Sequence, residues 1–161
     1  MNRRLGILLA TLASLAAFGP IAPARSQGMA AQAVPSRQVT IFGIHAIPDG
    51  GGVIDPKLRK IEPQLRKLFP GKGYSFKLLA SASKRLGVDD LVFCRLGGGF
   101  VAGVTLRSPL DGEGNIRMQF DLELNEQIEF TTIVRTPPNQ LFFCDKTLPD
   151  GSKLLIGLGG R

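Results

Sequence analysis

The chain has 161 residues but only one histidine, two cysteines and no apolar run as long as a membrane-spanning helix. Structural metal sites use several His or Cys ligands at regular spacing, which one histidine and two distant cysteines do not supply. A spanning helix needs about 20 apolar residues, whereas the longest run, Leu5 to Phe18, has 14. We therefore predict no metal, no cofactor and no transmembrane segment in the mature protein.

Motifs of catalysis and nucleotide binding are also absent. No Gly-x-Ser-x-Gly elbow accompanies His45, and the cysteines lack Cys-x-x-Cys spacing. The glycine run of residues 47–53 lacks the Gly-Lys-Ser/Thr ending of a phosphate loop. We interpret His45 as a packed or hydrogen-bonded strand residue. Nucleic-acid binding is not predicted, because only Tyr74 and Phe76 lie near lysines in the way such binding requires.

A glycosidase-type hydrolase would need two carboxylates in one cleft. The nearest candidates are Asp121, Glu123, Glu126 and Glu129. The first two alternate with Arg117 and Gln119, which is typical of a solvated strand face. We therefore predict no catalytic residue, and a hydrolase acting on an envelope polymer stays the competing class.

The first 26 residues have the pattern of an export signal. Arg3 and Arg4 give a basic start, the apolar run follows, and Ala24 and Ser26 are the small residues that a signal peptidase reads. We predict cleavage before Gln27 and delivery to the periplasm or the extracellular space. The alternatives are an uncleaved anchor and export by the twin-arginine route, since two arginines also begin such signals.

After this segment we predict a flexible lead-in over residues 27–37 and a single β-rich domain over residues 38–161. Charge is divided unevenly within them. Residues 37–85 contain ten Lys or Arg against three Asp or Glu, whereas residues 86–161 contain seven against ten. The basic half therefore favours an acidic partner.

Alternating apolar residues and regularly spaced turns predict a mostly β domain of class α+β. The predicted strands cover residues 38–47, 74–80, 91–96, 100–107, 115–124, 127–135, 141–146 and 153–158. The first strand is apolar on both faces, which predicts a central position. We predict an antiparallel sandwich or partly closed barrel of seven or eight strands with one amphipathic helix. The glycine-rich end, residues 157–161, is predicted to be loose.

The predicted helix begins at Asp55-Pro56, because Asp is a good N-cap and Pro suits the first helical position. Its core-facing stripe contains Leu58, Ile61, Leu65, Leu68 and Phe69. Pro63 on the other side should bend it. That side is basic, and we predict that an acidic partner contacts Lys57, Arg59, Lys60, Arg66, Lys67 and Lys72. The alternative is a solvated face that keeps the domain soluble.

Cys94 and Cys144 each end the first strand of a predicted hairpin. An even number of cysteines in an exported protein predicts a disulfide between them. The bond would close a loop of about 50 residues and contribute roughly 4 kcal/mol in the chain-entropy model. The alternative is two buried free thiols.

The order of the elements resembles a loosely defined group of small exported bacterial β-rich proteins without assigned activity. The matching motifs are Ile54-Asp55-Pro56-Lys57-Leu58, Leu65 and Tyr74-Ser75-Phe76-Lys77-Leu78-Leu79. The resemblance implies export and architecture and assigns no chemistry.

Together these features indicate an exported, non-enzymatic binding or interaction module of the envelope or periplasm. One predicted mode docks the basic helix face on an anionic envelope component or acidic protein and weakens with salt. The other adds a partner's strand to an exposed sheet edge and tolerates salt. Besides the hydrolase, an assembly factor for another exported protein stays an alternative.

Overall fold

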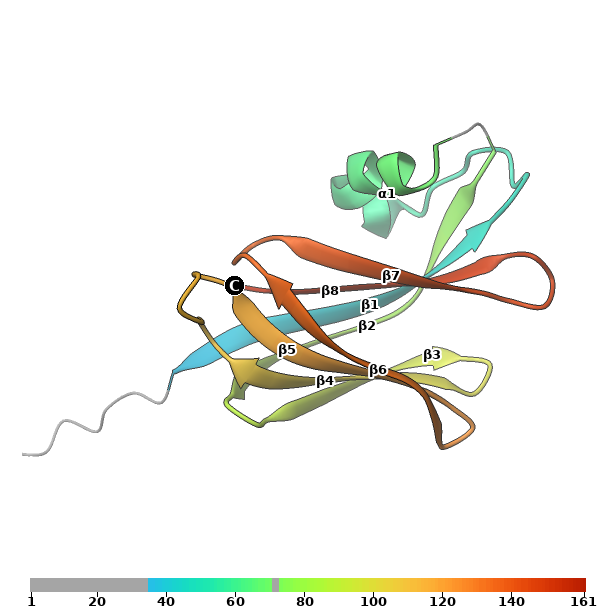
Figure 1. The fold of residues 1–161 in the computed structure, drawn as a ribbon. Coiled ribbons are helices and arrows are strands. Elements are labelled where there is room, and N and C mark those ends of the chain that lie inside the picture. Colours follow the sequence, from blue (N-terminus) through green and yellow to red (C-terminus); the bar gives the residue numbers. More distant parts are fainter. Residues whose placement is uncertain (1–34, 71–72) are drawn as a thin grey trace, which may run out of the picture. The chain divides into compact units, whose positions relative to one another are not determined.

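Two four-stranded antiparallel sheets form the domain (Figure 1). The computed structural model describes residues 35–70 and 73–161. The first sheet has the order β2-β1-β8-β7, and its strands are β1 (Ser36–Ile47), β2 (Ser75–Gly87), β7 (Leu141–Thr147) and β8 (Lys153–Gly160). The second has the order β3-β4-β5-β6, and its strands are β3 (Leu91–Gly97), β4 (Phe100–Ser108), β5 (Ile116–Leu124) and β6 (Gln127–Thr136). No ladder joins the two sheets within the described residues, so the fold is a sandwich and not a closed barrel.

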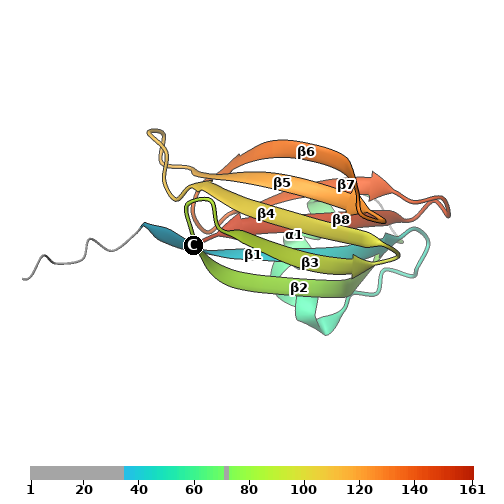
Figure 2. The same cartoon turned by 90° about the horizontal axis from the view of Figure 1, so that it is seen from below.

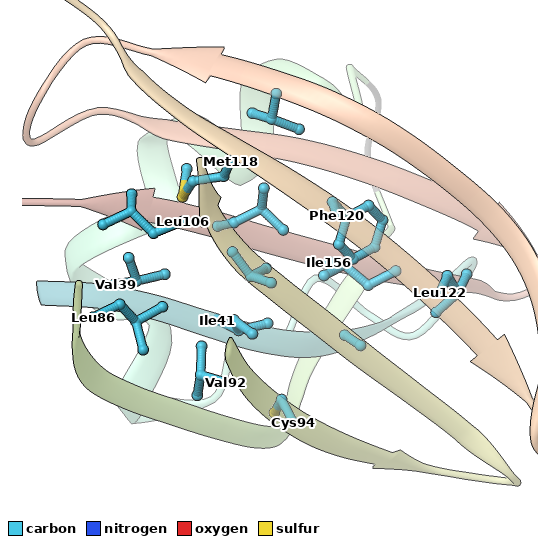
Figure 3. Close-up of a cluster of buried hydrophobic side chains, with 14 of the residues drawn as sticks. Val39, Ile41, Leu86, Val92, Cys94, Leu106, Met118, Phe120, Leu122 and Ile156 are labelled. Atoms are coloured by element: carbon cyan, nitrogen blue, oxygen red, sulfur yellow. The ribbon is translucent and has the colours of Figure 1, made fainter. Parts of the chain in front are cut away.

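The inner faces of the two sheets enclose the main core. Figure 3 shows Val39 and Ile41 from β1 and Ile156 from β8 beside Leu106, Met118 and Phe120 from the second sheet. All six side chains are buried. In Figure 2 the strands from β3 to β6 lie side by side in chain order, as expected for consecutive hairpins. The alternation predicted for residues 115–124 is confirmed, because β5 buries Ile116, Met118, Phe120 and Leu122.

A second core lies on the opposite face of the first sheet, under a short helical segment. This segment consists of a 3-10 helix, η1 (Pro56–Ile61), and a helix of seven residues, α1 (Glu62–Leu68). Its buried residues pack against both central strands and β2, and the cluster contains Ile44, Ala46, Leu58, Leu65, Phe69, Phe76 and Leu155. Because both faces of the first sheet are covered, β1 is apolar on both sides, and its predicted central position is confirmed.

The predicted helical segment is confirmed, but Pro63 divides it into η1 and α1 and does not merely bend it. Proline has no N–H to donate to the carbonyl of Arg59, and the Glu62 N–H donates to that carbonyl instead. The chain therefore leaves the 3-10 helix and starts α1 with Pro63 in its first turn. Asp55 is the N-cap, as predicted, and its carboxylate accepts the N–H of Lys57 at 2.9 Å. Leu68, predicted to face the core, is exposed.

The prediction of a loose C-terminal end is wrong. Residues up to Gly160 belong to β8, which lies between β1 and β7. The N–H of Gln38 donates to the carbonyl of Arg161 at 2.9 Å, and the N–H of Arg161 donates back at 3.0 Å. The glycines allow this burial, because a Cβ atom at Gly157 would lie 2.2 Å from the Phe42 ring.

Several predicted boundaries also differ from the structure. β1 begins at Ser36, two residues before the predicted domain start at Gln38. β2 continues to Gly87, because Ala80, Ala82 and Leu86 pack on the main core although polar residues separate them. The predicted signal segment, the lead-in before Pro35, and Lys72 lie outside the described residues. Within the described part of the chain, no helix has the length and apolarity to cross a bilayer.

Candidate functional site

The sandwich is open on the side where β6 and β7 lie. Each of these strands is at the edge of its sheet, so each has a hydrogen-bonded neighbour on one side only. They are joined by a corner with two prolines, Pro137 and Pro138, which have no N–H for a ladder. The corner is fixed by the Asn139 N–H, which donates to the carbonyl of Gly160 at 2.8 Å. Figure 1 shows that β6 and β7 diverge with increasing distance from this corner.

Where the two strands have separated, they border a cleft of about 250 Å³, which we call the β6–β7 groove. Its apolar lining comes from both sheets and consists of Phe120, Leu122, Phe130, Cys144 and Ile156. Phe130 on β6 packs on the ring of Phe120, with 6.2 Å between the ring centroids and an interplanar angle of 61°. The groove is therefore an opening into the main core.

Three charged side chains complete the lining of the groove: Glu129, Asp145 and Lys146. Lys146 pairs with Glu129 across the groove, and its ammonium also lies 5.5 Å from the centre of the Phe100 ring. Asp145 pairs with Lys153 of β8 at 2.8 Å. Because each acidic side chain has its own lysine, the rim carries little net charge.

β6 is unusually apolar for an exposed strand. Ile128 is 66% exposed, Phe130 47% and Ile133 44%. The register places Phe130 opposite Leu122, whereas Ile133 is opposite Gln119. Phe130 therefore faces the groove and Ile133 faces the outer side of the second sheet. Edge strands are commonly protected by charges or prolines against pairing with other chains, but Glu129 is the only charged residue among residues 127–134.

Only some of the basic residues predicted to contact an acidic partner form an exposed basic surface. Lys57, Arg59, Lys60 and Lys67 are exposed. Arg66 is not a free cation, because it donates to the carbonyls of Gly52 at 2.7 Å and Tyr74 at 3.1 Å and pairs with Glu62 at 3.3 Å. Its guanidinium holds the loop before η1 against the start of β2. Lys72 lies outside the described residues.

The two cysteines are free thiols on different sheets, Cys94 on β3 and Cys144 on β7. Burial raises the pKa of both thiols, and burial together with the Asp145 carboxylate raises the pKa of Cys144 to about 12. Neither thiol is therefore activated as a nucleophile. The disulfide stays a prediction.

The carboxylates considered for hydrolysis do not line the groove, apart from Glu129. Asp121 lies on the outer face of the second sheet and accepts hydrogen bonds from Thr131 at 2.8 Å and Gln119 at 3.1 Å. Among the described residues, no group of three His, Cys, Asp or Glu side chains is arranged to hold a metal ion. His45 is hydrogen-bonded to Ser152 at 2.7 Å, as interpreted from the sequence.

Comparison with family models, with curated proteins and with solved structures gave no match. The resemblance to small exported β-rich proteins therefore stays a prediction.

The sequence did not indicate the β6–β7 groove. The weak signal is the run of apolar residues at 128, 130 and 133, which does not keep the strict alternation of β5. A register shift pairs Ile128 with Glu123 and Phe130 with Leu122, so these two residues face opposite sides of the sheet although they are two positions apart.

Proposed function

We propose that this protein is an exported, non-enzymatic binding module of the envelope or periplasm that takes an extended segment of a partner protein into the β6–β7 groove. The observation that carries the proposal is a pair of unpaired strand edges that border one apolar groove. Export is itself a prediction from the first 26 residues.

The backbone supplies the first part of the recognition. A free strand edge presents a row of N–H and C=O groups, and an extended peptide satisfies them by adding one more strand. Within the described residues, β6 pairs only with β5 and β7 only with β8. A peptide along either edge extends an existing sheet, and the Pro137-Pro138 corner closes one end of its path.

The side chains supply the second part. In strand addition, alternate side chains of the peptide enter pockets and give specificity. The β6–β7 groove offers one apolar pocket between Phe130 on β6 and Cys144 on β7, with Ile156 beneath. We therefore expect an extended segment with an apolar residue at its centre, because burial of such a side chain contributes about 1.5–3 kcal/mol.

The charge of the rim favours a neutral segment. Lys146 is paired with Glu129 and Lys153 with Asp145, so no unpaired charge of the groove attracts an oppositely charged peptide. Binding through the groove should then be nearly independent of salt, whereas binding through the basic helix face should weaken as salt rises. A factor that holds another exported protein before assembly would use the same groove.

The test is selection of peptides from a displayed random library on the purified protein, followed by affinity measurement at low and high salt. We expect apolar-centred peptides whose affinity changes little with salt. Phe130→Ser should weaken binding about tenfold or more, since it removes one wall of the apolar pocket. N-methylation of alternate backbone amides in the peptide should abolish binding, because it removes ladder hydrogen bonds.

Ile133→Ser is the matched control, because Ile133 lies on the same strand with nearly the same exposure but faces away from the groove. The proposal fails if both variants weaken binding equally, or if N-methylated peptides bind as well as unmodified ones. Circular dichroism of each variant verifies that the fold is retained.

The basic helix face stays a second candidate, because Lys57, Arg59 and Lys60 are exposed and no ion pair occupies them in the described part of the chain. Their reversal to Glu should abolish retention on anionic vesicles at low salt. The control reverses Arg95, Arg117 and Arg135, which are exposed on the second sheet and change the net charge by the same amount. Equal loss in both variants would assign the retention to net charge alone.

A further inference from the structure

The end of the sandwich where the β3–β4 and β7–β8 turns lie contains two adjoining clefts. One has a volume of about 240 Å³, and His45 is the only polar side chain in its lining, which otherwise includes Leu79, Leu96, Phe100, Leu148 and Leu154. The second, of about 500 Å³, shares Gly98, Phe100 and Leu148 with it. Small-molecule sites are mostly apolar clefts with a few polar groups, and the cleft at His45 has this kind of lining.

A chain of hydrogen bonds fixes the His45 ring. The Asp150 carboxylate accepts the backbone N–H of Ser152 at 2.9 Å and its hydroxyl at 2.6 Å. The Ser152 hydroxyl oxygen lies 2.7 Å from Nε2 of His45. Ser152 is buried, with 3% of its surface exposed. The two hydrogen bonds from Ser152, together with the nearby His45, lower the pKa of Asp150, which keeps it a carboxylate.

This chain determines which ring nitrogen of His45 holds the proton. A carboxylate only accepts hydrogen bonds, so the Ser152 proton points to Asp150. The Ser152 oxygen must then accept a proton from Nε2 of His45. In the neutral imidazole only one nitrogen is protonated, and Nδ1 is therefore left with a free lone pair. The same direction of the Ser152 proton means that His45 does not activate Ser152 as a nucleophile.

Nδ1 is also accessible. It makes no hydrogen bond to any residue that the structure describes. In the same part of the chain, every buried side-chain nitrogen or oxygen has a partner. An unpartnered Nδ1 is therefore not fully buried, and the ring that carries it lines the apolar cleft.

We propose that this cleft binds a small uncharged amphiphile, whose apolar body lies between Leu96, Phe100 and Leu148 and whose hydroxyl or amide N–H donates to Nδ1 of His45. A carboxylate head is a poor match, because it would face a lone pair on a ring that is linked through Ser152 to the Asp150 carboxylate. Lys77 is opposite His45 in the β1–β2 register, but it is exposed and does not line the cleft. The cleft at His45 shares no lining residue with the β6–β7 groove, although the adjoining cleft has Lys146 in common with the groove. The proposal does not depend on the proposed function.

The experiment uses the single histidine of the chain as its probe. Protein labelled with ¹⁵N in histidine gives imidazole signals that need no assignment, and these report which nitrogen is protonated. We expect Nε2 to carry the proton in the free protein. Added 1-octanol should shift Nδ1 in a saturable way, octane should leave Nδ1 unshifted, and octanoate should bind more weakly than 1-octanol.

Three variants test the apolar cleft and the hydrogen-bond chain of His45 separately. Leu79→Trp should fill the mouth of the cleft and weaken 1-octanol binding about tenfold or more. Val88→Trp is its control, because Val88 has similar exposure, 45% against 40%, and lines none of the clefts described here. Ser152→Ala should abolish the fixed tautomer, because it removes the acceptor of Nε2–H, and we therefore assign Ser152 as a positioning residue.

The proposal is overturned if 1-octanol leaves Nδ1 unshifted, if octanoate binds more tightly, or if Leu79→Trp and Val88→Trp bind 1-octanol equally well. An unchanged tautomer in Ser152→Ala would overturn the role assigned to Ser152. Phe130→Ser should leave 1-octanol binding unchanged, so failure of this site and failure of the β6–β7 groove are distinguishable.

Discussion

The ammonium of Lys146 on β7 forms an ion pair with the carboxylate of Glu129 on β6, across the open side of the sandwich. It joins strands that share no ladder in the described residues. The two side chains are 34% and 36% exposed, so water screens much of their attraction. The pair therefore spans the groove but contributes little to stability.

We expect Lys146→Met to lower the free energy of unfolding by no more than about 1 kcal/mol, because exposed ion pairs contribute about 0–1 kcal/mol. Methionine keeps an apolar stem beside Phe100. Urea denaturation of this variant, of Glu129→Gln and of the double variant gives the coupling energy. The pair of Lys153 and Asp145, which joins two hydrogen-bonded strands, is the control. A coupling above about 2 kcal/mol at the groove would contradict this expectation.

The Cys144 thiol should make the protein less stable at high pH. Its pKa rises from an ordinary value of 9.0 to about 12 in the folded state. Above pH 9 the unfolded chain releases the thiol proton while the folded protein keeps it, so unfolding becomes more favourable as pH rises towards 12. The contribution is at most about 1.4 kcal/mol per pH unit.

Cys144→Ala should remove this part of the pH dependence, which denaturation at several pH values above 9 measures. Thiol alkylation followed by mass spectrometry gives the second check. We expect slow labelling of Cys144 in the folded protein and fast labelling in denaturant. Labelling in denaturant that requires a reductant would instead establish the predicted disulfide with Cys94.

The strand pattern was predictable wherever the two faces of a strand meet different surroundings. β5 has the core on one side and solvent on the other, so its apolar residues alternate over residues 116–124. β2 was predicted too short, because its second half is at a sheet edge and interleaves Ala82 and Leu86 with Ser83 and Arg85. The inward-facing residues Ala80 and Ala82 are small, so the alternation of apolar and polar residues is weak in this part of β2.

The candidate sites were less predictable, because each depends on contacts between residues far apart in the sequence. The β6–β7 groove exists because both strands are edges, and sheet order is not encoded in either strand alone. His45 and Ser152 are 107 residues apart. For Arg66, the neighbouring Glu62 is visible in the sequence, whereas its contacts with the carbonyls of Gly52 and Tyr74 require the fold.

The Asp150 carboxylate should stabilise the folded protein at neutral pH and lose this contribution in acid. Its pKa lies below the ordinary value of 3.8, chiefly because the Ser152 hydroxyl and backbone N–H donate to it and His45 is near. The stabilisation is present above pH 3.8 and is lost as pH falls through the lowered pKa, since the unfolded chain binds the proton first. Ser152→Ala removes one of these hydrogen bonds, so its free energy of unfolding should fall less steeply than that of the parent as pH decreases below 4. An acid transition identical to that of the parent would contradict this assignment.

Gly157 on β8 should not tolerate a side chain. A Cβ atom there would lie 2.2 Å from Cε2 of Phe42 and 2.9 Å from Cε1 of Phe143, and both rings are packed on the second core. We expect Gly157→Ala to lower the free energy of unfolding by about 1–3 kcal/mol, the usual cost of overpacking. Gly112→Ala is the control, because a Cβ atom at Gly112 would meet no atom within 4 Å. Urea denaturation measures both, and equal stabilities would mean that the C-terminal strand is not held against Phe42 in solution.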